Sequence, residues 1–301
     1  MRIVNFGSLN IDYTYRVNHF VQAGETKSCQ NLSVNWGGKG LNQSIALARA
    51  GAEVYHAGFV GAEGSFLVEK LQQCGVNTEF IRFVDESNGH AIIQVNDSGE
   101  NCILLYPGTN HMLTLDYIDD VLAHFQPGDV VVLQNETNLV GEMIHKAAEC
   151  NLQVAFNAAP MDENVARYPL EKVKWLFVNE TEGAELAGQQ EVSQIPHLLS
   201  ARLPNTEIIL TMGKNGCIYT GSKQTVVMGA CDVKPVDTTG AGDTFIGFYL
   251  RSALEGKKPE TALQIATVAS AVAVTRSGAA SSIPDWTEVE NLFPRYQNEI
   301  S

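Results

Sequence analysis

Short apolar runs separated by helix-length segments dominate the chain after Leu115. They are Val130–Leu133, Gln153–Phe156, Trp175–Val178 and Glu207–Thr211. Short runs of this kind, bounded by polar residues, are typical of parallel strands that are buried on both faces. The pattern therefore predicts an α/β fold in which a mostly parallel central sheet lies between two layers of helices.

The N-terminal part continues this rhythm. Arg2–Phe6 and residues 53–61 have the pattern of buried strands, whereas residues 39–51 and Gly64–Cys74 have the pattern of helices. Gly51 is placed to terminate the first of these helices, because glycine readily adopts the left-handed conformation found just after a helix.

Four further segments alternate apolar and polar residues, as half-exposed strands do. They are Tyr13–Val21, Lys27–Asn35, Gly89–Asn96 and Glu100–Tyr106. The last two flank 97-DSG-99, which is a hairpin signal. We expect these segments to form a small β-sheet from two discontinuous stretches, about 13–35 and 89–106, within a single domain over residues 1–301. An apolar face on such a sheet would cover a site or a partner subunit.

Composition and charge narrow the possible functions. The formal net charge of −14 argues against a broad surface for nucleic acid or an anionic membrane. No run approaches the ~18 apolar residues of a membrane span, and residues 3–11 are too polar for a signal peptide. The six cysteines lack a CxxC pair and are expected to be reduced, mostly packed thiols of a cytoplasmic protein. The seven histidines are scattered without an HExxH pattern, so no His/Cys metal site is expected.

The stretch 236-VDTTGAGDTF-245 places two acids around a glycine-rich turn, before a helix expected over Asp243–Leu254. Small residues there let the backbone approach an anion, and free N–H groups at a helix start favour negative charge. Two interpretations of Asp243 remain open. It is either a helix cap or a base that takes a proton from a substrate hydroxyl.

Two N-terminal motifs offer polar groups to a small polyol. In 7-GSLNID-12, Asn10 and Asp12 point the same way if the segment is extended. In 37-GGKGLNQ-43, glycines precede a helix that carries Lys39 and Asn42, although a packing turn would also explain this motif alone. Glu136 follows a buried strand, where α/β sheets usually keep their ligand groups.

Two later motifs also allow two interpretations each. In 177-FVNETE-182, Asn179 and Glu182 have the spacing of a capping box, or they organise water around Mg²⁺ and a phosphate. In 211-TMGKNG-216, two glycines around a basic residue either contact a nucleotide or form a tight turn between strands.

Taken together and in this order, the motifs resemble the ribokinase branch of the PfkB family of carbohydrate kinases over nearly the whole chain. GGKG near the N-terminus combined with DTTGAGDTF near the C-terminus is the specific part of the resemblance. It implies a ribokinase-like three-layer α/β/α fold and ATP-dependent transfer of the γ-phosphoryl group to a sugar hydroxyl, with Mg²⁺. It also implies that the small sheet is a lid over the sugar and that two lids pair in a homodimer.

The resemblance also assigns roles to individual residues. Asp243 matches the catalytic base, and Gly240, Ala241 and Gly242 match the anion hole. The positions that match sugar ligands are Asn10, Asp12, Gly38, Lys39, Asn42, Glu136 and Asp243. The positions that match nucleotide ligands are Asn179, Glu182, Thr211, Gly213, Gly216, Gly242 and Thr267. The positions that match a monovalent-cation (K⁺) site, several of them through backbone carbonyls, are Asp237, Thr239, Ala273, Arg276, Gly278 and Ser282. For Asp237 the alternative is an Asx-turn that only shapes the loop.

Around the sugar the chain departs from the family pattern. Trp36, Leu41 and 106-YPGTN-110 are larger than the residues usual there, and one methylene can be worth ~1–3 kcal/mol of discrimination between substrates. D-ribose, giving D-ribose 5-phosphate, is the first prediction. Deoxyribose, another pentose, fructose or a nucleoside remains open, as does an inactive sugar-binding regulator. A dinucleotide oxidoreductase is disfavoured, because no GxGxxG follows the first strand.

Overall fold

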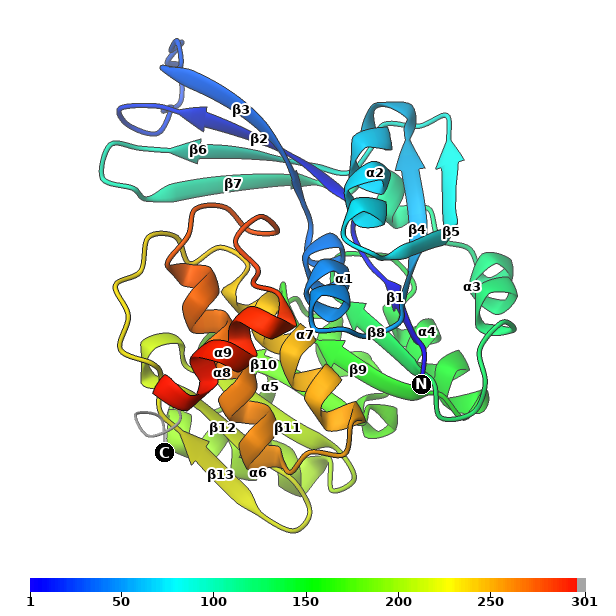
Figure 1. Ribbon diagram of the computed structural model, residues 1–301. Helices are drawn as coiled ribbons and strands as arrows, with labels where there is room; N and C mark the ends of the chain where they lie inside the picture. Colours follow the sequence, from blue (N-terminus) through cyan, green and yellow to red (C-terminus); the bar gives the residue numbers. More distant parts are fainter. Residues whose placement is uncertain (297–301) are drawn as a thin grey trace.

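A computed structural model describes residues 1–296, and its larger sheet has nine strands in the order β13-β12-β11-β10-β9-β8-β1-β4-β5 (Figure 1). The pairs β11–β12 and β12–β13 are antiparallel and all other pairs are parallel, which confirms the predicted mostly parallel sheet. The strands are β1 (Ile3–Phe6), β4 (Val54–Gly61), β5 (Asn77–Val84), β8 (Val130–Gln134), β9 (Gln153–Asn157), β10 (Trp175–Asn179), β11 (Glu207–Thr211), β12 (Cys217–Thr220) and β13 (Thr225–Met228).

Helices cover both faces of this sheet, so the three-layer prediction is confirmed. One face packs against α1 (Lys39–Arg49), α2 (Ser65–Gln73), α7 (Ala241–Leu254), α8 (Pro259–Val274) and α9 (Trp286–Tyr296). The other packs against α3 (Leu115–Leu122), α4 (Val140–Glu149), α5 (Glu180–Ala187) and α6 (Ile195–Arg202). Short 3₁₀ turns lie at Ala62–Gly64, Gly108–His111, Val165–Arg167, Leu170–Lys172, Val192–Gln194 and Gly213–Asn215.

Successive residues of the buried strands serve opposite layers. In β8, Val130 and Val132 join the hydrophobic cluster under α1 and α7, whereas Val131 and Leu133 join the cluster under α3 and α4. Both faces of each strand therefore need apolar residues, which is why these strands appear in the sequence as unbroken apolar runs.

A second sheet of four strands, in the order β3-β2-β6-β7, projects from the larger one (Figure 1). Its strands are β2 (Asn10–Arg16), β3 (Asn31–Gly37), β6 (His90–Val95) and β7 (Asn101–Tyr106). The hairpin predicted at residues 97–99 is confirmed by the antiparallel pairing of β6 with β7. The first two strands differ from the prediction: β2 begins and ends earlier, and β3 begins later.

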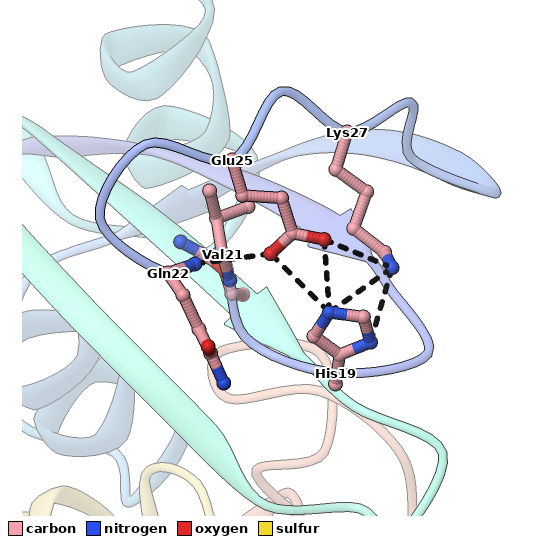
Figure 2. A network of polar contacts seen from close by, with 6 residues as sticks. His19, Val21, Gln22, Glu25 and Lys27 are labelled. Carbon is pink, nitrogen blue, oxygen red and sulfur yellow. Dashed lines mark hydrogen bonds and ion pairs between the residues drawn. The ribbon is translucent and has the colours of Figure 1, made fainter.

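Side-chain contacts explain why the predicted strands do not continue through the connection between β2 and β3. Figure 2 shows the imidazole of His19 between Glu25 and Lys27, with Nε2 3.0 Å from Glu25 Oε1 and Nδ1 3.1 Å from Lys27 Nζ. Glu25 also accepts a hydrogen bond from the backbone N–H of Gln22 at 3.1 Å. These local bonds hold the segment in a loop instead of a ladder.

Large apolar side chains remain exposed on the small sheet. The strand β7 is exposed along its whole length, and Leu104 is 68% exposed. Through the registers of β6 with β7 and of β2 with β3 and β6, Leu104 shares one face of the sheet with Ile92, Tyr13 and Val34.

Two predictions about composition can be compared with the structure. None of the six cysteines forms a disulfide, and only Cys217 and Cys231 are buried, so the prediction of mostly packed thiols is wrong. The three exposed cysteines lie on the surface of the small sheet and its connection or at the end of α4, where no core is available to cover them. Within residues 1–296 no helix combines the length and the apolar character needed to cross a membrane.

Candidate active site

The N-termini of α1 and α7 meet beside the segment that joins β1 to β2. A Cβ atom on Gly40 would overlap the backbone of Gly7 and Ser8, so only glycine lets α1 approach this segment so closely. The backbone N–H of Leu41 donates to the carbonyl of Ser8 at 3.0 Å, and that of Gly40 donates to Ser8 Oγ at 3.1 Å. The glycines of GGKG therefore place the first turn of α1 against residues 7–12.

Asp243 lies in the first turn of α7, is 7% exposed, and is held by two side-chain amides of α1. Asn42 Nδ2 donates to its Oδ2 at 3.0 Å, and Gln43 Nε2 donates to its Oδ1 at 2.9 Å. Asp243 therefore does not cap α7 with its own side chain, since both oxygens face donors from another helix. This arrangement fixes the orientation of the carboxylate.

The polar residues of the 7–12 segment form hydrogen bonds to residues distant in the sequence. Asn10 begins β2 and accepts at Oδ1 from Asn110 Nδ2 at 2.7 Å. Glu136 Oε2 accepts from the Ser8 hydroxyl and from the backbone N–H of Lys39 at 2.9 Å. Hydrogen bonds thus connect five segments that are far apart in the chain.

Lys39 interacts electrostatically with three carboxylates in this region. Burial alone would lower the pKa of its ammonium, but the carboxylates of Asp243, Glu136 and Glu182 outweigh burial and raise it. Lys39 consequently stays a cation, and its charge links the proposed sugar residues to Glu182, which belongs to the proposed nucleotide residues.

Asp12 is the most perturbed acid of the site. Burial, with a further contribution from the negative charge of Glu136, raises the pKa of Asp12 to about 7. Its carboxylate packs directly on Gly37, its neighbour on β3, where a Cβ atom would overlap it. A carboxyl group that is half-ionised near neutral pH and lies beside a hydroxyl-binding set is typical of a functional position.

The first turn of α7 offers backbone N–H groups to an anion. Gly240 adopts a left-handed conformation with φ 74°, and Ala241 donates its N–H to the carbonyl of Thr238 at 3.2 Å. The N–H groups of Gly242 and Asp243 belong to the first turn, which has no carbonyl of its own helix to bond. A Cβ on Gly242 would meet nothing within 4 Å, so no other part of the described chain packs against this residue on that side.

Asp237 joins two loops. Its Oδ1 accepts from the backbone N–H and the hydroxyl of Thr239, at 2.9 and 2.7 Å, and its Oδ2 accepts from the N–H of Gly278 at 2.9 Å. Partial burial would raise the pKa of Asp237, but these three hydrogen bonds outweigh it and lower the pKa. The Asx-turn expected as the alternative is therefore present, and it brings residues 237–239 against residue 278.

The oxygen groups beside this contact suit a monovalent cation. A carboxylate, hydroxyls and backbone carbonyls are hard ligands. Arg276 pairs its guanidinium with Glu288 of α9, so only its carbonyl is available to a cation. Ser282 is buried and donates its hydroxyl to the carbonyl of Ala279 at 2.8 Å. Among residues 1–296, no cluster of three or more His, Cys, Asp or Glu suited to a transition metal occurs.

The proposed nucleotide residues have clear structural roles of their own. Asn179 and Glu182 form a complete capping box at the start of α5, with 2.9 Å bonds in both directions. Gly216 ends the turn between β11 and β12, with φ 88°, and a Cβ there would overlap the carbonyl of Met228. Thr211 ends β11, and Thr267 lies on α8 with its side chain bonded to Cys217. These roles confirm the capping box and the turn between strands, and they leave the exposed Asn179 and Gly213 accessible to a ligand.

The sequence departs from the family pattern at Trp36, Leu41 and residues 106–110, which were expected to lie near the sugar. Leu41 is completely buried in the core under α1 and α7. Asp12 pairs with Asn35 of β3, so Trp36, the next residue, lies on the opposite face of the small sheet from Asp12. The ammonium of Lys70 lies 4.5 Å from the centre of the Trp36 ring. In the third departure, only Asn110 reaches the site. The expectation that Leu41 and Trp36 narrow the sugar pocket therefore finds no support in their positions.

Three residues of this site were not assigned from sequence. Ser8 bonds Glu136, Asn110 bonds both Asn10 and the N–H of Leu9, and Gln43 bonds Asp243. Gln43 lies in the GGKGLNQ motif, next to Asn42, so its position offered a signal. Ser8 and Asn110 act through other side chains, and only the folded arrangement reveals this.

Comparisons with known proteins identify the family of the chain. The sequence model described as pfkB family carbohydrate kinase matches residues 1–286. A ribokinase of Haemophilus influenzae is 34% identical over 289 residues, covering 92% of this chain and 94% of the relative, and a deoxyribokinase of Salmonella typhi is 31% identical, covering 94% and 96%. The structure of Arabidopsis thaliana ribokinase complexed with ribose and ATP superposes with a TM-score of 0.85 at 27% identity, covering 97% of this chain and 98% of the other.

Proposed function

Because the chain belongs to the pfkB family of carbohydrate kinases and is thus a phosphotransferase acting on an alcohol group, we propose that it phosphorylates D-ribose with ATP to give D-ribose 5-phosphate. The observation that carries the proposal is the position of Asp243, a buried carboxylate at the start of α7 with both oxygens held by amides of α1. The ribokinase relatives support the choice of ribose.

In the proposed reaction Asp243 takes the proton of the sugar 5-hydroxyl. The hydroxyl oxygen forms a bond to the γ-phosphorus, the bond from that phosphorus to the β-phosphate bridging oxygen breaks, and ADP leaves. Asn10, Asp12, Gly38, Lys39, Asn42 and Glu136 hold the sugar. The N–H groups of Gly242 and Asp243 receive the transferred group, since amides at a helix start offset its charge. Positioning and electrostatics supply most of the catalysis in phosphoryl transfer.

Two ions complete the proposal. Mg²⁺, when bound to ATP, neutralises phosphate charge, and Asn179 and Glu182 would organise its water shell. K⁺ would take oxygen ligands from Asp237, Thr239 and Ser282 and from the backbone carbonyls of Ala273, Arg276 and Gly278. The hydrogen bonds of Asp237 across the two loops support this placement, because an ion there would order the backbone that leads into Gly240.

The small sheet, from about residues 13–35 and 89–106, is proposed to act as a lid of the single kinase domain. Asn10 and Asp12 lie on β2, so a movement of this sheet would carry two proposed sugar ligands with it. The exposed apolar side chains around Leu104 support pairing of two such sheets in a homodimer. Six cysteines without a disulfide support a reducing compartment, and we place the enzyme in the cytoplasm.

A second candidate substrate is 2-deoxyribose, because the deoxyribokinase relative is almost as similar as the ribokinase relative. The two sugars differ only in the 2-hydroxyl. A site built to bond that hydroxyl discriminates strongly against its absence, since its buried partners would then be left unpaired.

The test is ADP release from ATP and Mg²⁺ with ribose, 2-deoxyribose, fructose and adenosine, each with K⁺ and with Na⁺. We expect turnover with ribose, increased by K⁺. Turnover with 2-deoxyribose alone would replace the substrate and keep the mechanism. An Asp243→Asn enzyme is expected to lose ~10²- to 10⁴-fold in kcat, and near-full kcat in that variant would contradict the role of Asp243.

A further inference from the structure

A layer of polar side chains lies between the main sheet and α1, almost entirely withdrawn from solvent. Asn5, His56 and Gln134 extend from the neighbouring strands β1, β4 and β8, and Gln43 and Ser44 extend from α1. Gln134 is 1% exposed and the other four are 0% exposed. Buried polar groups destabilise a fold unless they are hydrogen-bonded, so the partners of these five decide what the layer does.

At one end the hydrogen-bond directions are fixed by a backbone carbonyl. His56 Nε2 lies 3.1 Å from the carbonyl of Gly7, which can only accept, so this nitrogen carries the hydrogen. Burial lowers the pKa of His56 to about 4, and the neutral ring accepts at Nδ1 from the Ser44 hydroxyl at 2.8 Å. Ser44 Oγ then accepts from Asn5 Nδ2 at 2.9 Å. Each amide and hydroxyl in this part thus has one consistent orientation.

At the other end of the layer, the same series of hydrogen bonds reaches Asp243. Gln134 Nε2 donates to Asn5 Oδ1 at 3.0 Å and to Gln43 Oε1 at 2.8 Å. The amide oxygen of Gln43 is therefore occupied, and its nitrogen is directed at Asp243 Oδ1, 2.9 Å away. If the Gln43 amide were rotated by 180°, its oxygen would face the Asp243 carboxylate and its nitrogen would face the donor Nε2 of Gln134. The hydrogen bonds therefore exclude that orientation.

We propose that Gln43 is a positioning residue for Asp243 and that the buried chain behind it, from Gln134 to His56, fixes its orientation. The inference rests on the proposed function, in which Asp243 is the base. With Asn42 on the other oxygen, Gln43 fixes the plane of the carboxylate. The charged group that faces Asp243 is Lys39, which also belongs to α1. The helix α8 packs against α7, and its one ionisable residue is Glu260 in its first turn. A neutral donor aligns the base while lowering its proton affinity less than a second cation would.

The test is the pH profile of kcat in Gln43→Glu. This change keeps an acceptor for Gln134 but replaces the donor to Asp243 with a second carboxyl group. Two carboxyl groups in hydrogen-bond contact share a proton, which raises the pKa of the base. We expect the acid limb of the kcat profile to move up by about one pH unit or more, and kcat at pH 7 to fall ~10- to 100-fold with a smaller change in the sugar KM.

Thr206→Val is the matched control. Thr206 is also buried, and its hydroxyl donates to the carbonyl of Val173 at 2.8 Å and not to any member of the polar layer behind Asp243. This variant loses a buried hydrogen bond and should keep the wild-type pH profile. If Gln43→Glu does not fold, Gln43→Met removes both bonds without adding charge, and kcat should still fall ~10-fold with KM within about threefold.

Two failures can be told apart. If Asp243→Asn keeps near-full kcat, the proposed base is wrong and the inference about Gln43 falls with it. If Asp243→Asn is inactive but Gln43→Glu or Gln43→Met behaves like Thr206→Val, the mechanism stands and Gln43 is only a structural residue. A raised acid limb in Gln43→Glu, absent from Thr206→Val, supports the positioning role.

Discussion

Asp12 should release a proton when the sugar binds, and this release can be measured without turnover. In the free enzyme, burial and the charge of Glu136 raise the pKa of Asp12 to about 7. Sugar hydroxyls that donate to the carboxylate stabilise its charged form, so the pKa of Asp12 in the complex lies below that in the free enzyme. Binding therefore converts the protonated fraction of Asp12 into carboxylate and free protons.

The size of the release follows from the free-enzyme pKa. A group with a pKa of about 7 is roughly half protonated at pH 7 and about nine-tenths protonated at pH 6. We expect a release of up to about 0.5 proton per site at pH 7, more at pH 6 and almost none at pH 8.5. For the same reason kcat/KM for the sugar should fall up to about tenfold per pH unit well below pH 7, because that parameter reports on the free enzyme.

The assay is titration calorimetry of ribose binding in buffers of different ionisation heats, without ATP. Asp12→Asn should abolish the proton release and weaken binding. Asp243→Asn should keep the release, which separates the two acids. Glu136→Gln should shift the release to lower pH, because the charge of Glu136 contributes to the raised pKa. Proton uptake on binding, or no exchange between pH 6 and 8, would refute the reasoning.

Three further changes test the site and the assembly. Gly37→Ala should displace the Asp12 carboxylate that packs on it and raise the sugar KM ~10-fold or more with little change in the melting temperature; an unchanged KM would contradict the contact. Asp237→Asn should lower the ratio of activity in K⁺ to activity in Na⁺ toward one, and a retained K⁺ effect would remove Asp237 from the cation site. Leu104→Asp should shift the protein from dimer to monomer in sedimentation at micromolar concentration, whereas Val227→Asp, on β13 and equally exposed at 68%, should not.

The parallel core could be predicted from sequence because burial on both faces leaves an unbroken apolar run, as in Val130–Leu133. The outer strands leave no such run: β5 and β13 have several residues that face solvent, and β12 has only four residues. No residue range was predicted for these three strands, although the turn between strands at residues 211–216 implied a strand after it. The ends of β2 and β3 were misplaced for a different reason. They depend on pairing with strand β6, distant in sequence, and on side-chain bonds within the connecting loop.

The candidate site divides in the same way. The residues within each motif could be proposed from sequence, because the motif itself brings a glycine turn and a polar side chain together. The partners could not: Asn42 and Asp243 are 201 residues apart, and Asn10 and Asn110 are 100 apart. The two roles proposed for Asn179 and Glu182 show a further limit. A capping box and a ligand site use the same atoms, so finding the cap does not decide between them.

Polar residues within otherwise apolar strands were a signal that the periodicity alone left unexplained. Asn5, His56 and Gln134 each interrupt a buried strand, and all three lie on the face that packs against α1. Apolar residues could fill these positions without disturbing the fold. An amide without hydrogen bonds there would lower the free energy of unfolding by about 1–3 kcal/mol. The layer is tolerated because each member bonds the next, although Gln134 Oε1 lacks a hydrogen-bond partner among the described residues. The same bonds direct one amide of α1 at the carboxylate of α7. The stability of the core and the geometry of the base are thus set by one group of hydrogen bonds, so substitutions deep in β1 or β8 should alter catalysis as well as folding.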